Sequence, residues 1–420
     1  MRSTLLILFI FSSIAIYSQE GRYYKTIEEG LENPEKVRNL TLSRKNLTEF
    51  PPDLIKFKNL KFLNLSGNKL ETIPNWIGQL DSLEILILKH NKIKQIPESI
   101  GNLYKLKDLV LDYNNLNYLP KNLKNLKLLN SLSVSNNELS AFPESVLELI
   151  NLEYLYFNEN NINSIPPNIK NLKKLNELWL KNNKISSLPK EIIALKELKE
   201  LYLTLNKIIN LPEDIGNLNN LETLDLGSNN LISLPESIGK LDNLFYLYLG
   251  NNTNFSHFPE SIGNLKSIKL IELSSSNEIT SIPDSFSNLK TLEMLTLDGC
   301  KNLGFPETIL NLESLWLLRL RNNDIQEIPK RIVNLKNLEK LFLNNNNISS
   351  IEVICELKNI KSLLLNNNNI VTIPKCITNL KRLKKLNLNW NKIKKKEIKK
   401  VESLLKEIVN ELDIKNQNKN

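Results

Sequence analysis

A repeat of 23 residues runs through most of this chain and constrains its fold more than any other feature. The stretch from Leu221 to Asn243 reads LETLDLGSNNLISLPESIGKLDN, and the same order of apolar and polar positions starts again at Leu244. Units of this length bury their apolar side only against neighbouring copies, so they stack into a solenoid. The sequence therefore predicts one elongated array, although 420 residues would otherwise suggest several globular domains.

About 16 copies of the repeat share an apolar first position. These first residues are Val37, Leu60, Leu83, Leu106, Leu129, Leu152, Leu175, Leu198, Leu221, Leu244, Ile268, Leu292, Leu315, Leu338, Ile360 and Leu383. In each copy the order L-x-L predicts a short strand whose leucines point inward and whose other side chains point outward. Stacked strands must pair in parallel. The strict alternation indicates that one face of the sheet meets solvent.

The ninth position of most copies is an asparagine, and we expect its amide to bond backbone groups in the loops of adjacent copies. The expected ladder consists of Asn68, Asn91, Asn114, Asn137, Asn160, Asn183, Asn206, Asn229, Asn252, Asn323, Asn346, Asn368 and Asn391. Over residues 244–315 two copies are one residue longer, and Ser276 and Cys300 take the asparagine position. We interpret that segment as a local change in curvature, and whether it has a function stays open.

The whole pattern, L-x-x-L-x-L-x-x-N-x-L-x-x-L-P-x-x-I, resembles the leucine-rich repeat family over residues 37 to about 410. The variant with L-P-x-x-I occurs in plant intracellular receptors, Ras-binding scaffold proteins and many bacterial proteins. The resemblance implies an α/β leucine-rich repeat solenoid, a curved horseshoe with a parallel sheet on its concave face. Short helical or extended segments would cover the convex face.

The N-terminal residues 1–18 have the layout of a secretory signal peptide, with Arg2 before an apolar run from Leu5 to Ile16. The run is too short for a good membrane span, so we expect no transmembrane span in the mature chain. No cysteine near the expected cleavage site offers a lipid anchor. We therefore expect a secreted, periplasmic or cell-surface protein.

Both ends of the array need a cap, because an open end would expose the apolar core. We expect residues 19–36 to form the N-terminal cap, 37–393 the repeats, 394–413 a C-terminal capping helix and 414–420 a disordered tail. The segment 394–413 is basic and amphipathic, so a membrane or partner helix is the alternative.

The residues needed for catalysis or metal binding are scarce. His90 and His257 lie far apart in the array, and the three cysteines lack metal-ligand spacing. We therefore predict no enzyme activity, no metal and no cofactor. Cys300 is expected to be a buried ladder residue. Cys355 and Cys376 lie on the convex side of adjacent copies, and their pairing stays open.

The outward strand positions are the best candidates for binding, because a rigid sheet presents them at fixed spacing. Tyrosine and tryptophan are common in interface hot spots, although aromatic residues also suit strands for packing reasons. The predicted partner-binding residues are Tyr154, Tyr156, Glu177, Trp179, Glu200, Tyr202, Asp225, Tyr246 and Tyr248. Earlier copies add Phe62, Ile85, Ile87, Val110 and Tyr113.

The charge pattern restricts the kind of partner. Acidic side chains among the candidate residues would repel phosphates, so we expect no nucleic acid on this face. The net charge of +9 is interpreted as a solvated lysine-rich surface. Arg319, Arg321 and Lys340 form a smaller basic region that suits an acidic partner or is simply solvated.

The resemblance to exported bacterial repeat proteins implies a monomeric, non-enzymatic protein-binding module that meets a host or surface protein. That implication rests on family analogy. Two alternatives stay open: a self-associating structural protein of the envelope, and an intracellular signalling scaffold of the Ras-binding type. The expected signal peptide opposes the scaffold. The sequence names no partner and leaves a glycan ligand possible.

Overall fold

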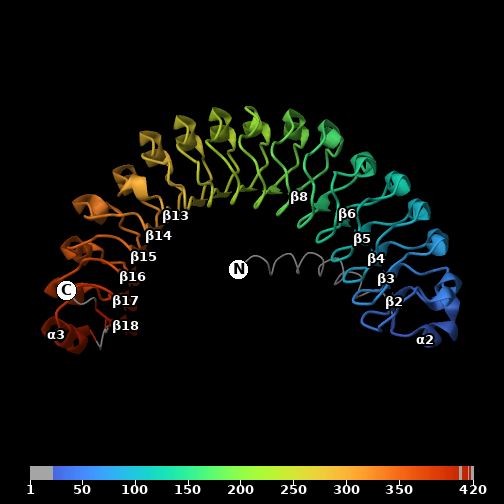
Figure 1. The fold of residues 1–420 in the computed structure, drawn as a ribbon, viewed down its shortest axis with the longest axis horizontal. Helices are drawn as coiled ribbons and strands as arrows, with labels where there is room; N and C mark the ends of the chain where they lie inside the picture. Colours follow the sequence, from blue (N-terminus) through green and yellow to red (C-terminus); the bar gives the residue numbers. More distant parts are fainter. Residues whose placement is uncertain (1–21, 406–408, 415, 418–420) are drawn as a thin grey trace. The chain divides into compact units, whose positions relative to one another are not determined.

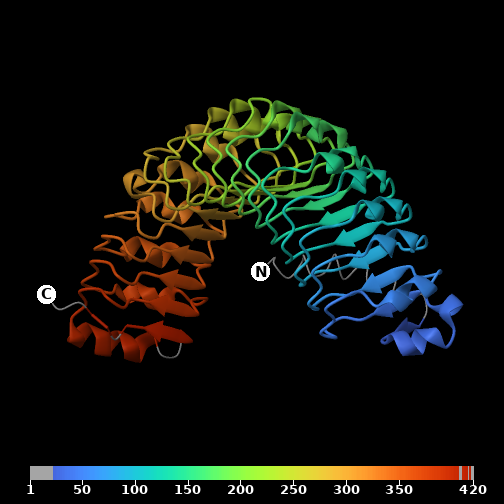
Figure 2. The same cartoon turned by 45° about the vertical axis from the view of Figure 1, so that its right-hand side comes forward.

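The computed structural model describes residues 22–405, 409–414 and 416–417. The expected signal peptide, 1–18, lies outside this part of the chain. Two compact units can be distinguished, Met1–Trp179 and Leu180–Asn420, and each is described separately. In both units the strands lie on one side of the repeats and short helices on the other (Figures 1 and 2).

The strands of the first unit are β1 Tyr23–Tyr24, β2 Asn39–Thr41, β3 Phe62–Asn64, β4 Ile85–Ile87, β5 Asp108–Val110, β6 Ser131–Ser133, β7 Tyr154–Tyr156 and β8 Glu177–Trp179. Those of the second unit are β9 Glu200–Tyr202, β10 Thr223–Asp225, β11 Tyr246–Tyr248, β12 Leu270–Glu272, β13 Met294–Thr296, β14 Leu317–Arg319, β15 Lys340–Phe342, β16 Ser362–Leu364, β17 Lys385–Asn387 and β18 Glu411–Asp413. Within each unit consecutive strands pair in parallel, as in the match of Leu224 with Leu247.

The outer side of the repeats is built mainly from 3₁₀ helices. In the first unit these are η1 Pro34–Lys36, η2 Pro52–Lys56, η3 Asn75–Gln79, η4 Glu98–Asn102, η5 Lys121–Asn125, η6 Glu144–Glu148 and η7 Pro167–Asn171. In the second they are η8 Lys190–Ala194, η9 Ile215–Asn217, η10 Glu236–Lys240, η11 Glu260–Asn264, η12 Asp284–Asn288, η13 Lys301–Leu303, η14 Glu307–Asn311, η15 Lys330–Asn334, η16 Glu352–Glu356 and η17 Lys375–Asn379. The α-helices are α2 Ile27–Leu31 and α3 Lys395–Leu405.

The core lies between the strands and the 3₁₀ helices, and its leucines and isoleucines are buried as the repeat pattern predicts. Successive 3₁₀ helices approach closely where the repeat has glycine. A Cβ atom on Gly239 would lie 2.2 Å from the carbonyl oxygen of Ser261 in the next repeat. The parallel open sheet and short outer helices confirm the predicted leucine-rich repeat solenoid.

The asparagine ladder is present and buried. Asn229, for example, is 5% exposed. Its Nδ2 donates to the carbonyl oxygens of Leu203 at 2.9 Å and Leu226 at 3.0 Å. Its Oδ1 accepts from the amide of Ile208 at 2.9 Å. One side chain therefore satisfies backbone groups of two consecutive repeats.

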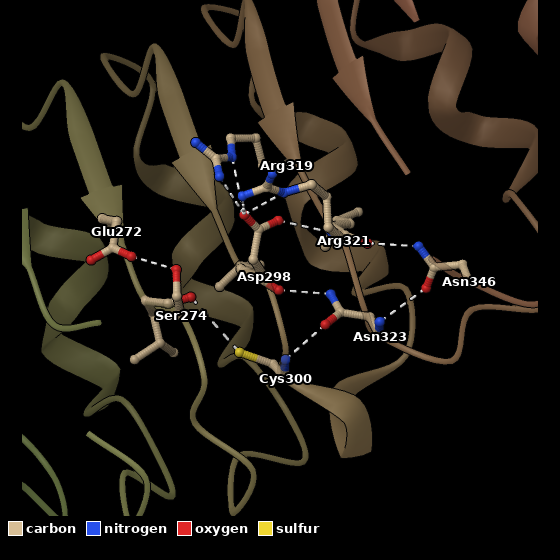
Figure 3. A network of polar contacts seen from close by, with 11 residues as sticks. Glu272, Ser274, Asp298, Cys300, Arg319, Arg321, Asn323 and Asn346 are labelled. Atoms are coloured by element: carbon tan, nitrogen blue, oxygen red, sulfur yellow. Dashed lines mark hydrogen bonds and ion pairs between the residues drawn. The ribbon is translucent and has the colours of Figure 1, made fainter. Parts of the chain in front are cut away.

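The irregular repeats keep the ladder with other side chains. The Ser276 hydroxyl donates to the carbonyl oxygen of Asn252 at 3.0 Å. The Cys300 thiol, labelled in Figure 3, donates to the carbonyl oxygen of Leu273 at 3.8 Å. The amide of Cys300 donates to Oδ1 of Asn323 at 2.7 Å. Burial raises the pKa of the Cys300 thiol to about 11, as expected for an inert structural cysteine.

The C-terminal end differs from the helix expected over 394–413. Helix α3 spans Lys395–Leu405, whereas strand β18 covers Glu411–Asp413 and pairs in parallel with β17. The physical reason is the alternating order of residues 409–414, VNELDI, which suits a strand that extends the sheet.

Within the segment expected to be a disordered tail, 414–420, the described residues Ile414 and Gln417 make defined contacts. Ile414 is 1% exposed. Nε2 of Gln417 donates to the carbonyl oxygens of Leu388 at 3.1 Å and Ile414 at 2.7 Å. Gln417 thus occupies the ladder position of a further partial repeat, and the signal was readable as V-x-x-L-x-I-x-x-Q over 409–417.

A disulfide joins Cys355 in η16 to Cys376 in η17, with Cα atoms 5.6 Å apart. The sequence left this pairing open. The two cysteines lie in the outer segments of consecutive repeats, where stacking brings equivalent positions together. The bond therefore cross-links neighbouring repeats near the C-terminal end of the second unit.

Candidate binding face

The third and fifth positions of each repeat point outward from the sheet and carry the candidate binding residues. In the first unit, Tyr154 and Tyr156 on β7 match Glu177 and Trp179 on β8 in register. The rings of Tyr156 and Trp179 meet edge to face, with centroids 5.3 Å apart. The Tyr156 hydroxyl donates to Oε2 of Glu177 at 2.9 Å. The aromatic contact is therefore edge-on.

These four residues differ in accessibility. Tyr156 is 5% exposed, whereas Tyr154, Glu177 and Trp179 are half-buried. Burial raises the pKa of Tyr154, and the charges of Glu153 and Glu177 act in the same direction. Tyr156 is therefore covered by its neighbours, whereas Tyr154, Glu177 and Trp179 remain partly accessible.

In the second unit the candidate residues surround an acidic side chain. Asp225 on β10 matches Tyr202 on β9 and Tyr248 on β11 in register. Glu200 and Tyr246 lie in the same way on either side of a buried threonine. All five candidate residues are half-buried. The two tyrosines at the fifth position are thus separated by a carboxylate and do not form a continuous aromatic stripe.

The Asp225 carboxylate is held in place by its own unit. Its Oδ1 accepts from the amide of Gly227 at 3.1 Å. Burial raises the pKa of Asp225, while hydrogen bonds from Thr204 and Gly227 and the charge of Lys181 act in the opposite direction. The carboxylate between the two tyrosines is thus fixed and partly desolvated, and its remaining lone pairs can accept from a hydrogen-bond donor.

The earlier apolar candidates do not form an accessible surface. Phe62, Ile85, Ile87 and Val110, on β3 to β5, make an apolar cluster in which no member is more than 4% exposed. Tyr23 packs against it, with its ring centroid 5.5 Å from that of Phe62. We therefore assign these four side chains to packing, although the alternation of the strands placed them on the binding face.

The sequence also did not reveal the hydrogen-bond donors that contact two acidic residues, each at the seventh position of its repeat. Asp112 is buried and accepts from Ser133 and Ser135, while Asp298 accepts from Arg319 and Arg321. Within the described residues, no group of three or more His, Cys, Asp and Glu side chains is arranged to hold a metal ion. Nor is any described helix long and apolar enough to cross a membrane.

Comparison with known families decides the identity of the fold. A sequence model of the family described as "Leucine-rich repeat region" matches residues 31–138, 98–207, 201–298 and 285–418. The chain belongs to the leucine-rich repeat family. A search of curated proteins found no match.

Solved structures of other leucine-rich repeat proteins are similar to this one. A leucine-rich repeat protein of Leptospira interrogans has 34% identity and a TM-score of 0.75, covering 93% of this chain and 99% of its own. The Arabidopsis receptor kinase HAESA, solved with the peptide hormone IDA and the co-receptor SERK1, has 28% identity and a TM-score of 0.62, covering 94% and 72%. An internalin of Listeria monocytogenes, with 23% identity, a TM-score of 0.57 and coverage of 85% and 88%, shares the fold.

Proposed function

We propose that this leucine-rich repeat protein is an exported, non-enzymatic module that binds a protein partner through the strand side of its repeats. One observation carries the proposal: Trp179 is half-buried at an outward position, and its ring meets that of Tyr156 on the adjacent strand edge to face. A tryptophan fixed in this way loses little side-chain entropy on binding and offers a large apolar area. Tyr202 and Tyr248 beside Asp225 supply a comparable surface in the second unit.

Two features support export. Residues 1–18 carry the charge and apolar pattern of a secretory signal peptide. The Cys355–Cys376 disulfide suits an oxidising compartment, because cytosolic thiols are normally kept reduced. Similarity to a Leptospira protein favours a bacterial source, and a surface or host protein is then the partner class to test first.

The test is a pull-down from serum, extracellular matrix and envelope extracts, with the purified chain as bait. The parent is compared with Trp179→Ala and with Tyr202→Ala. A matched control is Tyr104→Ala, which removes an aromatic ring that is 61% exposed at another position of the repeat.

We expect each test variant to weaken capture by about fivefold or more, which corresponds to roughly 1 kcal/mol, and the control to bind like the parent. If both test variants capture the partner as well as the parent does, the binding face lies elsewhere. Light scattering across a concentration series separates the alternative, because a self-associating structural protein would gain mass with concentration.

A further inference from the structure

Two arginines of the second unit converge on one buried carboxylate. Arg319 on β14 donates to Oδ2 of Asp298 through Nε at 3.0 Å and Nη2 at 2.7 Å. Arg321 donates to the same oxygen through Nε at 2.9 Å, and its Nη2 forms an ion pair with that oxygen at 2.8 Å. The amide of Arg321 donates to Oδ1 at 2.8 Å. Figure 3 shows both guanidinium groups directed at this single side chain.

The positive charge around Asp298 exceeds the single negative charge of its carboxylate. The Asp298 side chain is 9% exposed, whereas those of Arg319 and Arg321 are 32% and 35% exposed. Lys340 on β15 lies 5.2 Å from the ring centre of Trp316. Among the described residues Lys340 forms no ion pair. Two guanidinium groups therefore contact one carboxylate, and Lys340 adds a further positive charge on the neighbouring strand. Burial raises the pKa of Asp298, and the hydrogen bonds and charge of Arg321 act in the opposite direction.

In the first unit an equivalent buried carboxylate is hydrogen-bonded without arginines. Asp112 occupies the same seventh position of its repeat as Asp298 does. It accepts from the hydroxyl of Ser133 and, at 2.7 Å, from the amide of Ser135. Ser133 and Ser135 hold the fifth and seventh positions of the next repeat, which in the second unit are Arg319 and Arg321. Two serines thus satisfy the same buried acid, and the guanidinium groups are surplus to that task.

The guanidinium nitrogens that do not contact Asp298 have a defined geometry. Each arginine uses Nε and Nη2 on Asp298, so its Nη1 group points away from that contact. Neither Nη1 donates to another residue in the part of the chain that the structure describes. Locking two guanidinium groups on one carboxylate removes most of their freedom before any ligand binds, and planar guanidinium forks match carboxylate oxygens.

We infer that Arg319 and Arg321, positioned by Asp298, form a binding site for a carboxylate of a peptide or protein partner. Charge complementarity favours an anionic ligand, because the remaining N–H donors belong to the positively charged guanidinium groups of Arg319 and Arg321. Phe342, the register partner of Arg319 on β15, offers a half-buried ring beside the site for the partner's chain. Glu272 and Arg321 lie on opposite sides of Asp298 (Figure 3). The Glu272 carboxylate accepts hydrogen bonds from the amide of Gly250 and the hydroxyl of Ser274.

The site shares no residue with the surfaces of the proposed function, which centre on Trp179 in the first unit and on Tyr202 in the second, so it can be tested whether or not those surfaces bind a protein. The probe is fluorescein-labelled hexaglutamate with an amidated C-terminus, measured by fluorescence polarisation at low ionic strength, where charges are little screened. Labelled hexaglycine with a free C-terminus reports on terminal carboxylates. Amidated hexaglutamine is the uncharged control. Competition by inorganic phosphate reports on phosphate groups as ligands.

The decisive variant is Arg319→Ser with Arg321→Ser, which copies the surroundings of Asp112 and should therefore fold. The matched control, Lys301→Ser with Lys330→Ser, removes the same charge from two exposed positions of the same unit. We expect hexaglutamate to bind at least tenfold more weakly to the arginine variant and less than twofold more weakly to the control. Trp179→Ala with Tyr202→Ala should leave this binding unchanged.

Equal loss in the arginine variant and the control would overturn the site, because binding would then follow net charge alone. Phosphate competing better than glutamate peptides would overturn the carboxylate assignment. If the arginine variant does not fold, Arg319→Lys with Arg321→Lys gives an independent answer. It keeps both positive charges and removes the planar guanidinium forks, so hexaglutamate should bind severalfold more weakly, and unchanged binding would contradict the role of the arginines.

Discussion

Replacing Asn229 with alanine tests whether the ladder stabilises the array in the way its hydrogen bonds indicate. The variant removes the acceptor of the Ile208 amide and one donor to each of two buried carbonyl groups. Those carbonyls keep a partner, since Asn206 also donates to Leu203 and Asn252 also donates to Leu226. The Ile208 amide is thus the one group left with no replacement in the ladder.

The expected cost follows from this difference. A buried N–H group without a partner costs about 1–3 kcal/mol, and each lost bond to a carbonyl that keeps another partner costs less than about 1 kcal/mol. We expect Asn229→Ala to lower the free energy of unfolding by about 3 kcal/mol. The damage should be local, because each repeat depends on its neighbours for stability.

Urea denaturation measures the total loss, and hydrogen exchange at the Ile208 amide reports where it occurs. Asn230→Ala is the matched control, because it removes an exposed asparagine whose own contact to Ile208 is made by its backbone amide. An Ile208 amide that stays as protected in Asn229→Ala as in the control would refute the reasoning, whatever the denaturation midpoint.

Three further predictions concern other parts of the chain. Replacing Cys355 and Cys376 with serine should destabilise the C-terminal repeats by about 3 kcal/mol, measured by denaturation with the parent kept oxidised, because the 21-residue separation closes a sizeable loop. Gly239→Ala should lower the melting temperature, since its Cβ would meet a backbone oxygen at 2.2 Å, whereas Gly227→Ala, with no contact under 3.4 Å, should not. Burial raises the pKa of Asp108 to about 6. Because this lies above the unfolded value, stability should fall by on the order of 3 kcal/mol as pH rises from about 4 to 6, and Asp108→Asn should lack that component.

The fold could be predicted from the sequence because the same residue type recurs at each inward position in copy after copy of the repeat. The ladder asparagines and the leucines of L-x-L recur at fixed spacing, so a single departure such as Cys300 could still be assigned correctly. The end of the chain was harder, because residues 409–417 fit the strand pattern with Gln417 in place of asparagine and also continue the helical spacing of 394–405. Pairing with β17 favours the strand over the helix for Glu411–Asp413, and a local sequence pattern does not contain such a long-range contact.

The candidate binding face was less predictable. Alternation placed Tyr156 and Phe62 outward, yet both are buried by neighbouring side chains. Whether an outward residue is accessible depends on the size and direction of side chains on adjacent strands, which the period does not encode. The Cys355–Cys376 bond likewise depends on the distance between two outer segments, and spacing along the chain does not give that distance.

Asp112 and Asp298 show why the repeat specifies the fold and leaves the surface free to vary. Both acids are held by the fifth and seventh positions of the next repeat, so the backbone supplies the same geometry in each unit. Two serines complete the first site, and Arg319 and Arg321 complete the second. Because the same backbone geometry accommodates either pair, these positions can differ between repeats while the buried leucines of the core stay the same. In a repeat protein of this kind, the first residues to test for function are therefore those whose charge or hydrogen-bond donors go beyond what the buried carboxylate beside them needs.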